Sequence, residues 1–485
     1  MCLLRLTDFF AVKRYEKVAD EIAQSIRDGV LCRGDRLPSV RQTSTSRGIS
    51  PSTVFQAYYL LEARGLITAR ERSGYFVTGG ATGIPQLPEP SVHTNAEVTQ
   101  VEVSELVFEI LESVRARKVV PLGSAFPSPL LFPLGKLARC MASTVQAMDP
   151  WTTVSDLSPG DANLRRQIAL RYMMDGLHVP VDEIVITGGA LEALNLCLSA
   201  VTRPGDTVII ESPTFYAALQ AIERNGLQAV EVPSHPQYGI DLNALEHAIK
   251  QHKPQACWLM TNFQNPLGSL MPDEKKKELV ALLTKHQIPL IEDDVYGELY
   301  FGDKRPIPAK AFDTEGLVMH CSSFSKCLAP GYRVGWVAPG QYAQAVERIK
   351  LTTTLAASVP AQQALAGYLT KGGYDRHLRT LRHTLMVQQI KFIEAIEHYF
   401  PAGTRLSSPL GGYFVWVKLP NNVNALEVHR ASLMNGISVA PGPMFSAQRG
   451  FEDYIRLNYG HIWDANIEEA LARLGSIIST LTPKA

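Results

Sequence analysis

The segment Ser322–Arg333 most restricts what this 485-residue chain can fold into, because it gathers reactive and anion-binding groups in a short stretch. Ser323 and Ser325 precede Lys326, and Arg333 follows across a Pro-Gly turn. Lysine forms a Schiff base with pyridoxal phosphate, and hydroxyls with a guanidinium suit a phosphate group. A lysine among serines is also commonly a surface residue, so other parts of the chain must decide between these interpretations.

Two apolar runs upstream of this segment end in polar residues. Asn265 follows the run Ala256–Met260, and Asp293 and Tyr296 follow Ile288–Leu290. Both runs are typical of buried strands, and open α/β sheets present ligands at strand ends. A buried carboxylate such as Asp293 keeps a pyridine nitrogen protonated, while Tyr296 and Asn265 suit hydrogen bonds to the 3′ oxygen of the ring. The alternatives are an Asn-Pro turn and aspartates that cap helices.

With these blocks in this order, the chain from Leu106 to its end resembles a fold-type I, aspartate-aminotransferase-like protein. The resemblance implies an α/β body, with a large mixed-sheet domain and a small α+β domain, that binds pyridoxal 5′-phosphate. It implies that Lys326 is the catalytic lysine and forms the internal aldimine, and that Arg456 binds the carboxylate of an amino acid. The cofactor-binding residues that it implies are Lys326, Asn265, Asp293, Tyr296, Ser323, Ser325, Arg333, Gly188, Gly189, Ala190 and Phe215.

Size and composition bound the class of protein. The length allows about three compact units, and the composition is that of a globular protein with no net charge. The odd number of scattered cysteines, seven, argues against a disulfide framework and for a reducing, cytoplasmic location. No Cys/His cluster has zinc-site spacing, so we expect no metal site. No run approaches the ~18 apolar residues of a membrane span, so we expect no membrane partner.

The first eighty residues form a basic module, with 12 Lys and Arg against 8 Asp and Glu. Helical periodicity extends from Tyr15 to Val30. Ser39 is placed to cap a short helix rich in serine and threonine, and Ser50 to cap another. The segments 65–68 and 74–77 are typical of short strands around a basic turn. The pattern predicts a winged helix-turn-helix.

This module closely resembles the GntR family through Gly34–Arg41, Ile49–Val54 and Gly65–Ile67. The resemblance implies double-stranded operator DNA as a partner, with Ser50–Gln56 in the major groove. The residues implied to contact DNA are Arg41, Ser50, Ser52, Thr53, Gln56, Arg72 and Gly74. Pro51 and Phe55 stand where relatives often carry arginine, so fewer bidentate base contacts are available.

We predict a head at residues 13–79, a proline-containing linker at 80–104 and an aminotransferase-like domain at 105–485, with its small subdomain from about residue 361. Together they resemble the MocR subfamily of transcription regulators. The resemblance implies a cytoplasmic homodimer that binds DNA and senses pyridoxal phosphate, or an amino acid or amine effector, through exchange of the Lys326 aldimine. The alternative is a catalytically active aminotransferase that carries a DNA-binding head, because every residue needed for a first half-reaction is present.

Overall fold

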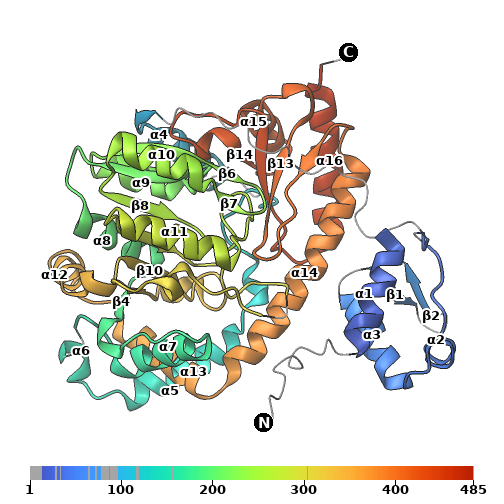
Figure 1. Ribbon diagram of the computed structural model, residues 1–485, viewed down its shortest axis with the longest axis horizontal. Coiled ribbons are helices and arrows are strands. Elements are labelled where there is room, and N and C mark those ends of the chain that lie inside the picture. Colours follow the sequence, from blue (N-terminus) through green and yellow to red (C-terminus); the bar gives the residue numbers. More distant parts are fainter. Residues whose placement is uncertain are drawn as a thin grey trace, which may run out of the picture. The chain divides into compact units, whose positions relative to one another are not determined.

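The computed structural model divides the chain into two compact units, with the main boundary between residues 84 and 85 (Figure 1). The structure describes residues 14–27, 30–32, 34–63, 66–70, 74–77, 87, 97–115, 119–155, 157–302 and 304–483. We call the described residues 14–77 the head and those from residue 97 onward the body.

The head has the element order of a winged helix-turn-helix, as the sequence predicts. Helices α1, α2 and α3 span Arg14–Arg27, Val40–Arg47 and Pro51–Ala63, and strands β1 and β2 pair antiparallel over Ile67–Arg70 and Gly74–Val77. The first helix is shorter than we expected. It ends at Arg27, and Val30, which we placed on its apolar face, is 74% exposed. A glycine precedes Val30 in the sequence, and glycine is a poor helix former.

An apolar core joins the helices of the head to the hairpin. Its buried members are Val18, Ala19, Ile22, Ala23, Ile26, Leu37, Val54, Ala57, Tyr58, Leu61, Ile67 and Val77. The Tyr58 hydroxyl lies 2.7 Å from Thr43 Oγ1 in α2 and donates to Pro38 O over 2.7 Å. The buried hydroxyl is therefore satisfied, and α3 supports α2 through it.

Capping stabilises α2, whose serine- and threonine-rich sequence has low helix propensity. Ser39 Oγ accepts from the Gln42 backbone N–H over 3.2 Å, and the Gln42 side chain accepts from the Ser39 N–H over 2.9 Å. This pair is a capping box, and it confirms Ser39 as the cap. At the other end Gly48 takes φ +61°, a left-handed conformation that glycine adopts without strain.

A mixed sheet with the strand order β3-β6-β5-β8-β9-β10-β11-β4 forms the centre of the large domain. Neighbours among β6, β5, β8, β9 and β10 are parallel, whereas β3, β11 and β4 each run antiparallel to the strand beside them. The strands are β3 (Val98–Gln100), β4 (Val185–Thr187), β5 (Thr207–Ser212), β6 (Gln228–His235), β8 (Ala256–Leu259), β9 (Leu290–Asp293), β10 (Val318–Ser323) and β11 (Gly335–Ala338), with β7 (Gly239–Ile240) paired to β6.

Helices pack on this sheet and close its apolar core (Figure 1). Helices α10 and α11 share a buried cluster with the parallel strands, through residues such as Leu245, Leu279 and Val230, and α8 packs against β9, β10 and β11. The helices of this domain are α4 (Ser104–Arg115), α5 (Leu134–Ala147), α6 (Thr152–Ser155), α7 (Ala162–Met174), α8 (Ala190–Val201), α9 (Tyr216–Arg224), α10 (Leu242–His252), α11 (Asp273–Lys285), α12 (Ala343–Thr353) and α13 (Val359–Thr370).

The small subdomain contains a second sheet, with the order β12-β13-β15-β14. We expected this subdomain from about residue 361, but α13 packs against α5 and α7 of the large domain, and the first strand of the sheet begins only at Arg405. Its elements are α14 (Gly373–Tyr399), β12 (Arg405–Leu406), β13 (Phe414–Lys418), α15 (Ala425–Met434), β14 (Ala440–Pro441), β15 (Tyr454–Asn458) and α16 (Ala465–Leu481). Among the helices that the structure describes, none has the length and apolar character of a membrane span.

The end of the predicted linker belongs to the body, which corrects the boundary at residue 104. Strand β3 lies within the segment 80–104 and pairs with β6 at the edge of the large sheet. Val101 and Val103, just after it, are buried at 2% and 0% exposure. The valines at positions 98, 101 and 103, set among polar residues, are a strand signal that we overlooked beside the prolines of the same segment.

Candidate functional site

The predicted cofactor residues follow three adjacent parallel strands. Asn265 follows β8, Asp293 ends β9, and Lys326 follows β10. Because the carboxyl ends of parallel neighbours meet at one edge of a sheet, these side chains come together there. Asn265 Nδ2 lies 3.5 Å from Tyr296 Oη, and Asn265 Oδ1 accepts from Arg456 over 2.9 Å.

Lys326 is held by a segment that crosses the site from residues 123 to 128. Its Nζ donates to Ala125 O over 2.8 Å and lies 3.8 Å from the centre of the Phe126 ring. Burial and the nearby cations Arg456 and Arg333 lower the pKa of Lys326 to about 7, although Asp293 acts against them. A large share of this amine is therefore neutral, and hence nucleophilic, near neutral pH.

The Asp293 side chain is 2% exposed, and its Oδ1 has no hydrogen-bond partner among the described residues. Burial raises the pKa of Asp293 to about 7, and the neighbouring Asp294 adds to the rise. A buried, unpaired acceptor beside a reactive lysine fits the protonated ring nitrogen of pyridoxal phosphate, which would supply the missing donor. The residues present therefore fit this cofactor.

Tyr296 is buried at 2% exposure and packs edge-on against Tyr413 and Phe414, with ring centres 5.5 and 5.7 Å apart. Burial raises the pKa of the Tyr296 phenol, with Arg456 acting against the rise, so the hydroxyl stays protonated and can donate. Phe215 immediately precedes α9, half-buried, with its ring centre 4.6 Å from that of Tyr216. Its contact with the cofactor stays a prediction.

The predicted phosphate residues converge on Arg333. Its guanidinium donates to Ser325 Oγ over 3.3 Å and to Gly188 O over 3.1 Å, and Ser323 Oγ accepts from the Ser325 N–H over 3.3 Å. Gly189 takes φ +104°, a conformation that favours glycine, and a side chain there would displace the Arg333 guanidinium. Arg333 itself takes φ +50°, a strained conformation for a non-glycine residue that is common at ligand sites.

One predicted phosphate donor is already engaged. The Gly188 N–H donates to the carboxylate of Glu192, which also accepts from Lys350 Nζ over 2.9 Å. The Gly188 N–H is therefore engaged within the protein in this structure, and a contact of Gly188 with the cofactor stays a prediction. Burial opposes ionisation of Glu192, but Thr354 and Lys350 outweigh it and lower its pKa, so the carboxylate is ionised. Gly189 and Ala190, at the start of α8, stay predicted phosphate contacts.

Arg456, in β15, is 1% exposed and donates to Asn265 Oδ1 and, over 2.7 Å, to Gly123 O. Its guanidinium lies 4.2 Å from the centre of the Phe414 ring, and its Nε has no partner among the described residues. Burial lowers its pKa from the usual value. A buried cation whose partners are neutral carbonyl groups suits an incoming carboxylate.

The sequence analysis missed the segment that crosses the site. Gly123 O, Ala125 O and the Phe126 ring all contact predicted site residues, and Asn458 Nδ2 fixes the segment by donating to Ser124 O and Phe126 O. Two of these groups are backbone carbonyls, and any residue type carries a carbonyl. The sequence therefore held no signal for them.

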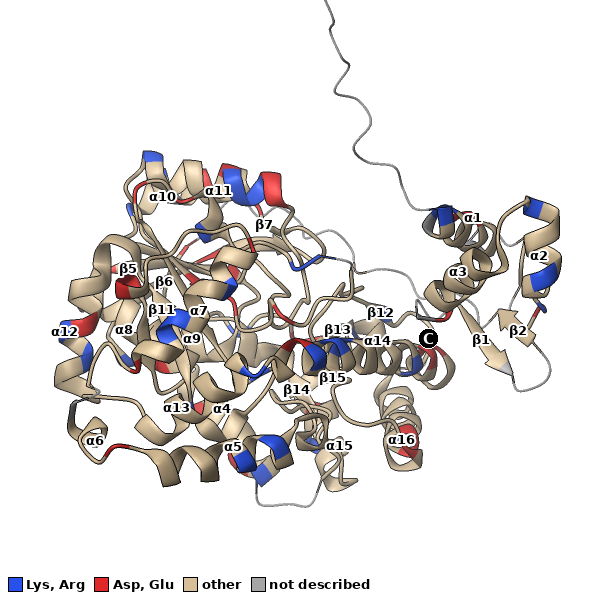
Figure 2. Cartoon of the chain, turned by 90° about the horizontal axis from the view of Figure 1, so that it is seen from below, with Lys and Arg blue, Asp and Glu red and all other residues tan. Residues whose placement is uncertain are grey.

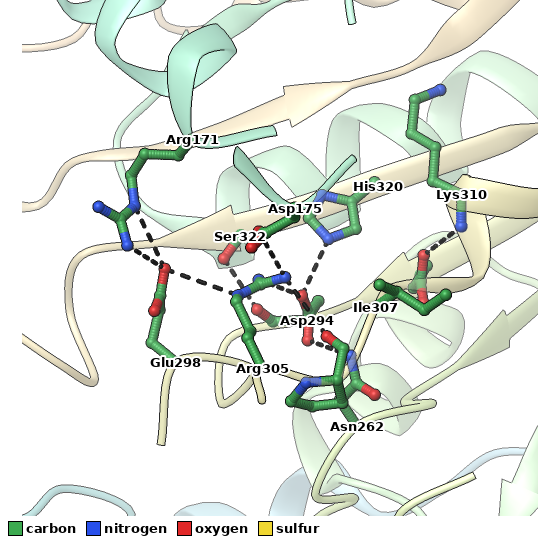
Figure 3. Close-up of polar contacts among 12 residues, drawn as sticks. Arg171, Asp175, Asn262, Asp294, Glu298, Arg305, Ile307, Lys310, His320 and Ser322 are labelled. Atoms are coloured by element: carbon green, nitrogen blue, oxygen red, sulfur yellow. Dashed lines mark hydrogen bonds and ion pairs between the residues drawn. The ribbon is translucent and has the colours of Figure 1, made fainter. Parts of the chain in front are cut away.

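A buried ionic network surrounds Asp294, the residue after Asp293, and was also missed (Figure 3). Asp294 accepts from Arg305 over 3.0 Å and from Asn262 Nδ2 over 3.0 Å, and its Oδ2 lies 3.1 Å from His320 Nε2. Burial opposes ionisation of Asp294, but Arg305 and His320 outweigh it and its pKa is lowered. Asp294 directly follows β9, so these contacts anchor the strand end that presents Asp293.

Asp294 links the two loops that carry the cofactor residues. Asn262, three residues before Asn265, binds Asp294 on one side and accepts from Lys276 Nζ over 2.7 Å on the other. A Cβ at Gly297 would lie 2.5 Å from Asp294 Oδ1, so the turn after Tyr296 closes around this carboxylate only because residue 297 is glycine. Arg305 extends the network to Asp175 over 3.1 Å and to Glu298 over 3.6 Å.

The predicted DNA residues of the head lie on α2, α3 and the start of β2. Arg41 is exposed on α2 and lines a shallow groove of about 1110 Å³ with Arg36 and Ser39. Ser50, just before α3, bonds Ser52 Oγ at 2.9 Å and Thr53 Oγ1 at 2.8 Å. The other predicted contacts are Gln56, exposed on α3, Gly74, exposed at the start of β2, and Arg72, which lies outside the described residues.

The two units match two families of known proteins. Residues 14–77 match the gntR family of bacterial regulatory proteins, and residues 142–474 match aminotransferase class I and II. The uncharacterized HTH-type transcriptional regulator YdcR of Escherichia coli K12 is 46% identical over 96% of this chain and 99% of its own length.

Solved structures resemble the body. The α-aminoadipate aminotransferase LysN of Thermus thermophilus, complexed with N-(5′-phosphopyridoxyl)-L-leucine, has a TM-score of 0.71 at 29% identity, over 79% of this chain and 96% of LysN. A multiple substrate aminotransferase of Thermococcus profundus has a TM-score of 0.71 at 26% identity, over 78% and 96%. The chain therefore belongs to the MocR subfamily of gntR-type regulators, with a winged helix-turn-helix head and a fold-type I, aminotransferase class I and II body.

Proposed function

We propose that this protein is a DNA-binding transcription regulator whose body binds pyridoxal phosphate and senses an amino acid. One observation carries the proposal: a gntR-type head shares its chain with a body that gathers Lys326 and the buried Asp293 and Arg456 in one site. A sequence-specific DNA-binding head serves no purpose in transamination, whereas it gives an occupied amino-acid site a regulatory output.

When bound, pyridoxal phosphate supplies an aldehyde that condenses with amines and a ring that withdraws electrons. The residues of the chain bind and orient it. Asp293 offers its unpaired Oδ1 to the ring nitrogen, and Tyr296 and Asn265 lie where they can bond the 3′ oxygen. Arg333, with Ser323 and Ser325, holds the phosphate. Lys326 competes with the effector for the aldehyde, which makes this site a sensor of amines.

Arg456 restricts the effector to compounds with a carboxylate near the amine. Its buried guanidinium binds neutral carbonyl groups, one of them on Asn265. An α-carboxylate would therefore supply the negative charge that these partners lack. The phosphopyridoxyl-leucine in LysN, a structural neighbour, supports an amino acid in a site of this kind. We expect an amino acid to change the visible spectrum of the wild-type protein far more than the amine made by its decarboxylation, and Arg456→Ala to remove the difference.

Regulation requires that the effector bind two conformations of the protein with different affinity. We propose that displacement of Lys326 from the aldehyde selects one of them, and that DNA affinity follows. Two heads on one operator require two copies of the chain, so we propose a cytoplasmic homodimer. Analytical ultracentrifugation of the full chain tests the dimer.

The central experiment follows the cofactor spectrum and DNA binding in the same full-length preparations. Lys326→Ala should remove the visible absorbance that depends on a covalent bond between this lysine and the cofactor, and with it the response of DNA binding to amino acids, yet leave effector-free DNA binding intact. Lys250→Ala, at an exposed lysine of α10, is the matched control and should change neither. An unchanged spectrum in Lys326→Ala would refute the cofactor assignment.

The alternative, an aminotransferase that carries a DNA-binding head, rests on the same three residues. Transfer of amino groups between a panel of amino and keto acids tests it. Turnover by the wild type, with DNA affinity indifferent to every compound that changes the spectrum, would favour the enzyme over the regulator.

A further inference from the structure

Helix α3 of the head has an aromatic outer face. Its inner face packs Val54, Ala57, Tyr58 and Leu61 into the core, each at 0% exposure. On the opposite side Phe55 and Tyr59, one helical turn apart, are 55% and 63% exposed. The head core is complete without these two rings, so their outward position is not a consequence of packing.

The same helix carries no lysine or arginine between Pro51 and Ala63. The described basic residues of the head lie on α1 and α2, in the segment before α2 and at the end of β1, whereas none lies on α3 (Figure 2). Arg36 and Arg41 are exposed beside the groove along α2, whereas Arg47 pairs with Glu21. The cations that can meet phosphates are thus separated from the helix that can enter the major groove.

The base edges that α3 can recognise follow from its side chains. Guanine is read mainly by arginine or lysine, and α3 has neither. Cytosine is read by an acidic side chain, but Glu62, the acidic residue of α3, accepts from the Ala69 N–H over 2.7 Å. An apolar ring contacts the thymine methyl group, and a glutamine amide pairs with adenine. Phe55 and the exposed Gln56, adjacent in the sequence of α3, offer these two groups.

We propose that α3 reads A·T base pairs, with the Phe55 ring against a thymine C5-methyl group and Gln56 on an adenine. The inference rests on the proposed DNA-binding function and adds to it the class of sequence recognised. Arg36 and Arg41 hold the phosphate backbone and set the register. Tyr59, one turn beyond Phe55, lies where its hydroxyl reaches sugar or phosphate oxygens.

DNA is the occupant that the charges favour. The first eighty residues carry an excess of four positive charges, and two exposed arginines border the groove next to α3. A second copy of this surface would bring the same exposed arginines together and be repelled by them. DNA, as a polyanion, would instead neutralise these arginines.

The test selects duplexes from a fully randomised DNA library with the full-length protein. We expect enrichment of thymine and adenine at the positions under α3. In the best duplex each thymine is then replaced singly by deoxyuridine, which removes only the C5-methyl group. At one thymine per half-site the wild type should lose affinity about four-fold, the worth of one buried methyl group.

Variants at Phe55 make the test specific. Phe55→Ala should bind the thymine and uracil duplexes equally, and Phe55→Leu, which keeps an apolar contact, should retain part of the discrimination. Phe108→Ala, at an exposed phenylalanine of α4 in the body, is the control and should behave as the wild type. Since Phe55 lies outside the core, these variants should fold.

The outcomes separate this inference from the function on which it rests. If no duplex is enriched, the DNA-binding function itself fails. If duplexes are enriched but guanine dominates under α3, or deoxyuridine costs nothing at every position, the thymine contact is wrong while DNA binding stands. If Phe55→Ala changes self-association and leaves DNA affinity unchanged, the aromatic face is a protein contact and the inference is overturned.

Discussion

The cofactor site of the body and the DNA face of the head place their functional groups in opposite environments. Asp293 and Arg456 are 2% and 1% exposed, and hydrogen bonds or ion pairs fix their neighbours before any ligand arrives. Phe55 is 55% exposed, and Arg41 lies open to solvent. Low exposure strengthens electrostatic interactions and makes each buried charge costly to leave unpaired. Substitutions should therefore affect stability strongly in the body and affinity alone at the DNA face.

The largest effect should come from Asp294→Ala, which removes one of the carboxylates that bind Arg305 and leaves Asn262 and His320 without this buried partner. Loss of one partner of a buried ion pair costs about 3–5 kcal/mol, so we expect a reduction of that order in the free energy of unfolding, measured by denaturant titration. Asp375→Ala removes a half-exposed partner of Arg171 and should cost about 0–1 kcal/mol. Equal, small losses for both variants would contradict the anchoring role of Asp294.

The next largest effect should be a loss of stability with rising pH, which we expect in the body. Burial raises the pKa of Glu211 to about 8 from the usual 4.5, so the folded body binds a proton that the unfolded chain has released. The contribution of Glu211 to the free energy of unfolding is fully present below pH 4.5 and is lost as pH rises through about 8. The body should lose stability over this window, with Glu231, whose pKa burial raises to about 7, adding to the loss.

Glu211→Gln isolates this effect. The Met260 N–H, which donates to Glu211 over 2.8 Å, keeps an acceptor in the glutamine carbonyl. Comparing unfolding free energies at about pH 5 and about pH 8, we expect the variant to remove on the order of 1 kcal/mol or more of the loss. A slope identical to that of the wild type would mean that Glu211 is ionised throughout.

In the head, Tyr58→Phe tests whether one phenol joins α2 to α3. The substitution leaves Thr43 Oγ1 and Pro38 O without this partner, and an unsatisfied buried group costs about 1–3 kcal/mol. Native-state hydrogen exchange of the α2 amides measures the change. Tyr59→Phe, which removes an exposed hydroxyl one position further on, is the control and should leave exchange unaltered.

The smallest effect on folding, and a clear effect on affinity, should follow Arg41→Ala. The side chain is exposed, so stability should change by no more than about 0.5 kcal/mol. DNA affinity should fall for all sequences alike, and the slope of log affinity against log salt should fall by about one unit per copy of the head that is bound. An unchanged slope would show that Arg41 makes no phosphate contact.

The sequence was sufficient for the framework of both regions. Strand-end residues such as Asn265, Asp293 and Lys326 carry their position in the apolar runs before them, and Ser39 carries the start of α2 in its capping pattern. Contacts between residues that lie far apart in the chain could not be predicted from the sequence. Nothing in the sequence predicted that Arg305 and Asn262 bind Asp294, and nothing in residues 123–126 marked a segment that reaches Lys326 through a backbone carbonyl.

The division of α3 into two faces has a consequence for how such regulators diversify. Val54, Ala57 and Tyr58 are committed to the fold, whereas Ser52, Phe55 and Gln56 stand free of it. None of these six residues is both packed in the core and exposed on the outer face. New operator preferences can therefore arise in evolution, or be installed in the laboratory, one outward residue at a time and without repair elsewhere. The cofactor pocket offers no comparable freedom, because its chemistry and its architecture depend on the same side chains.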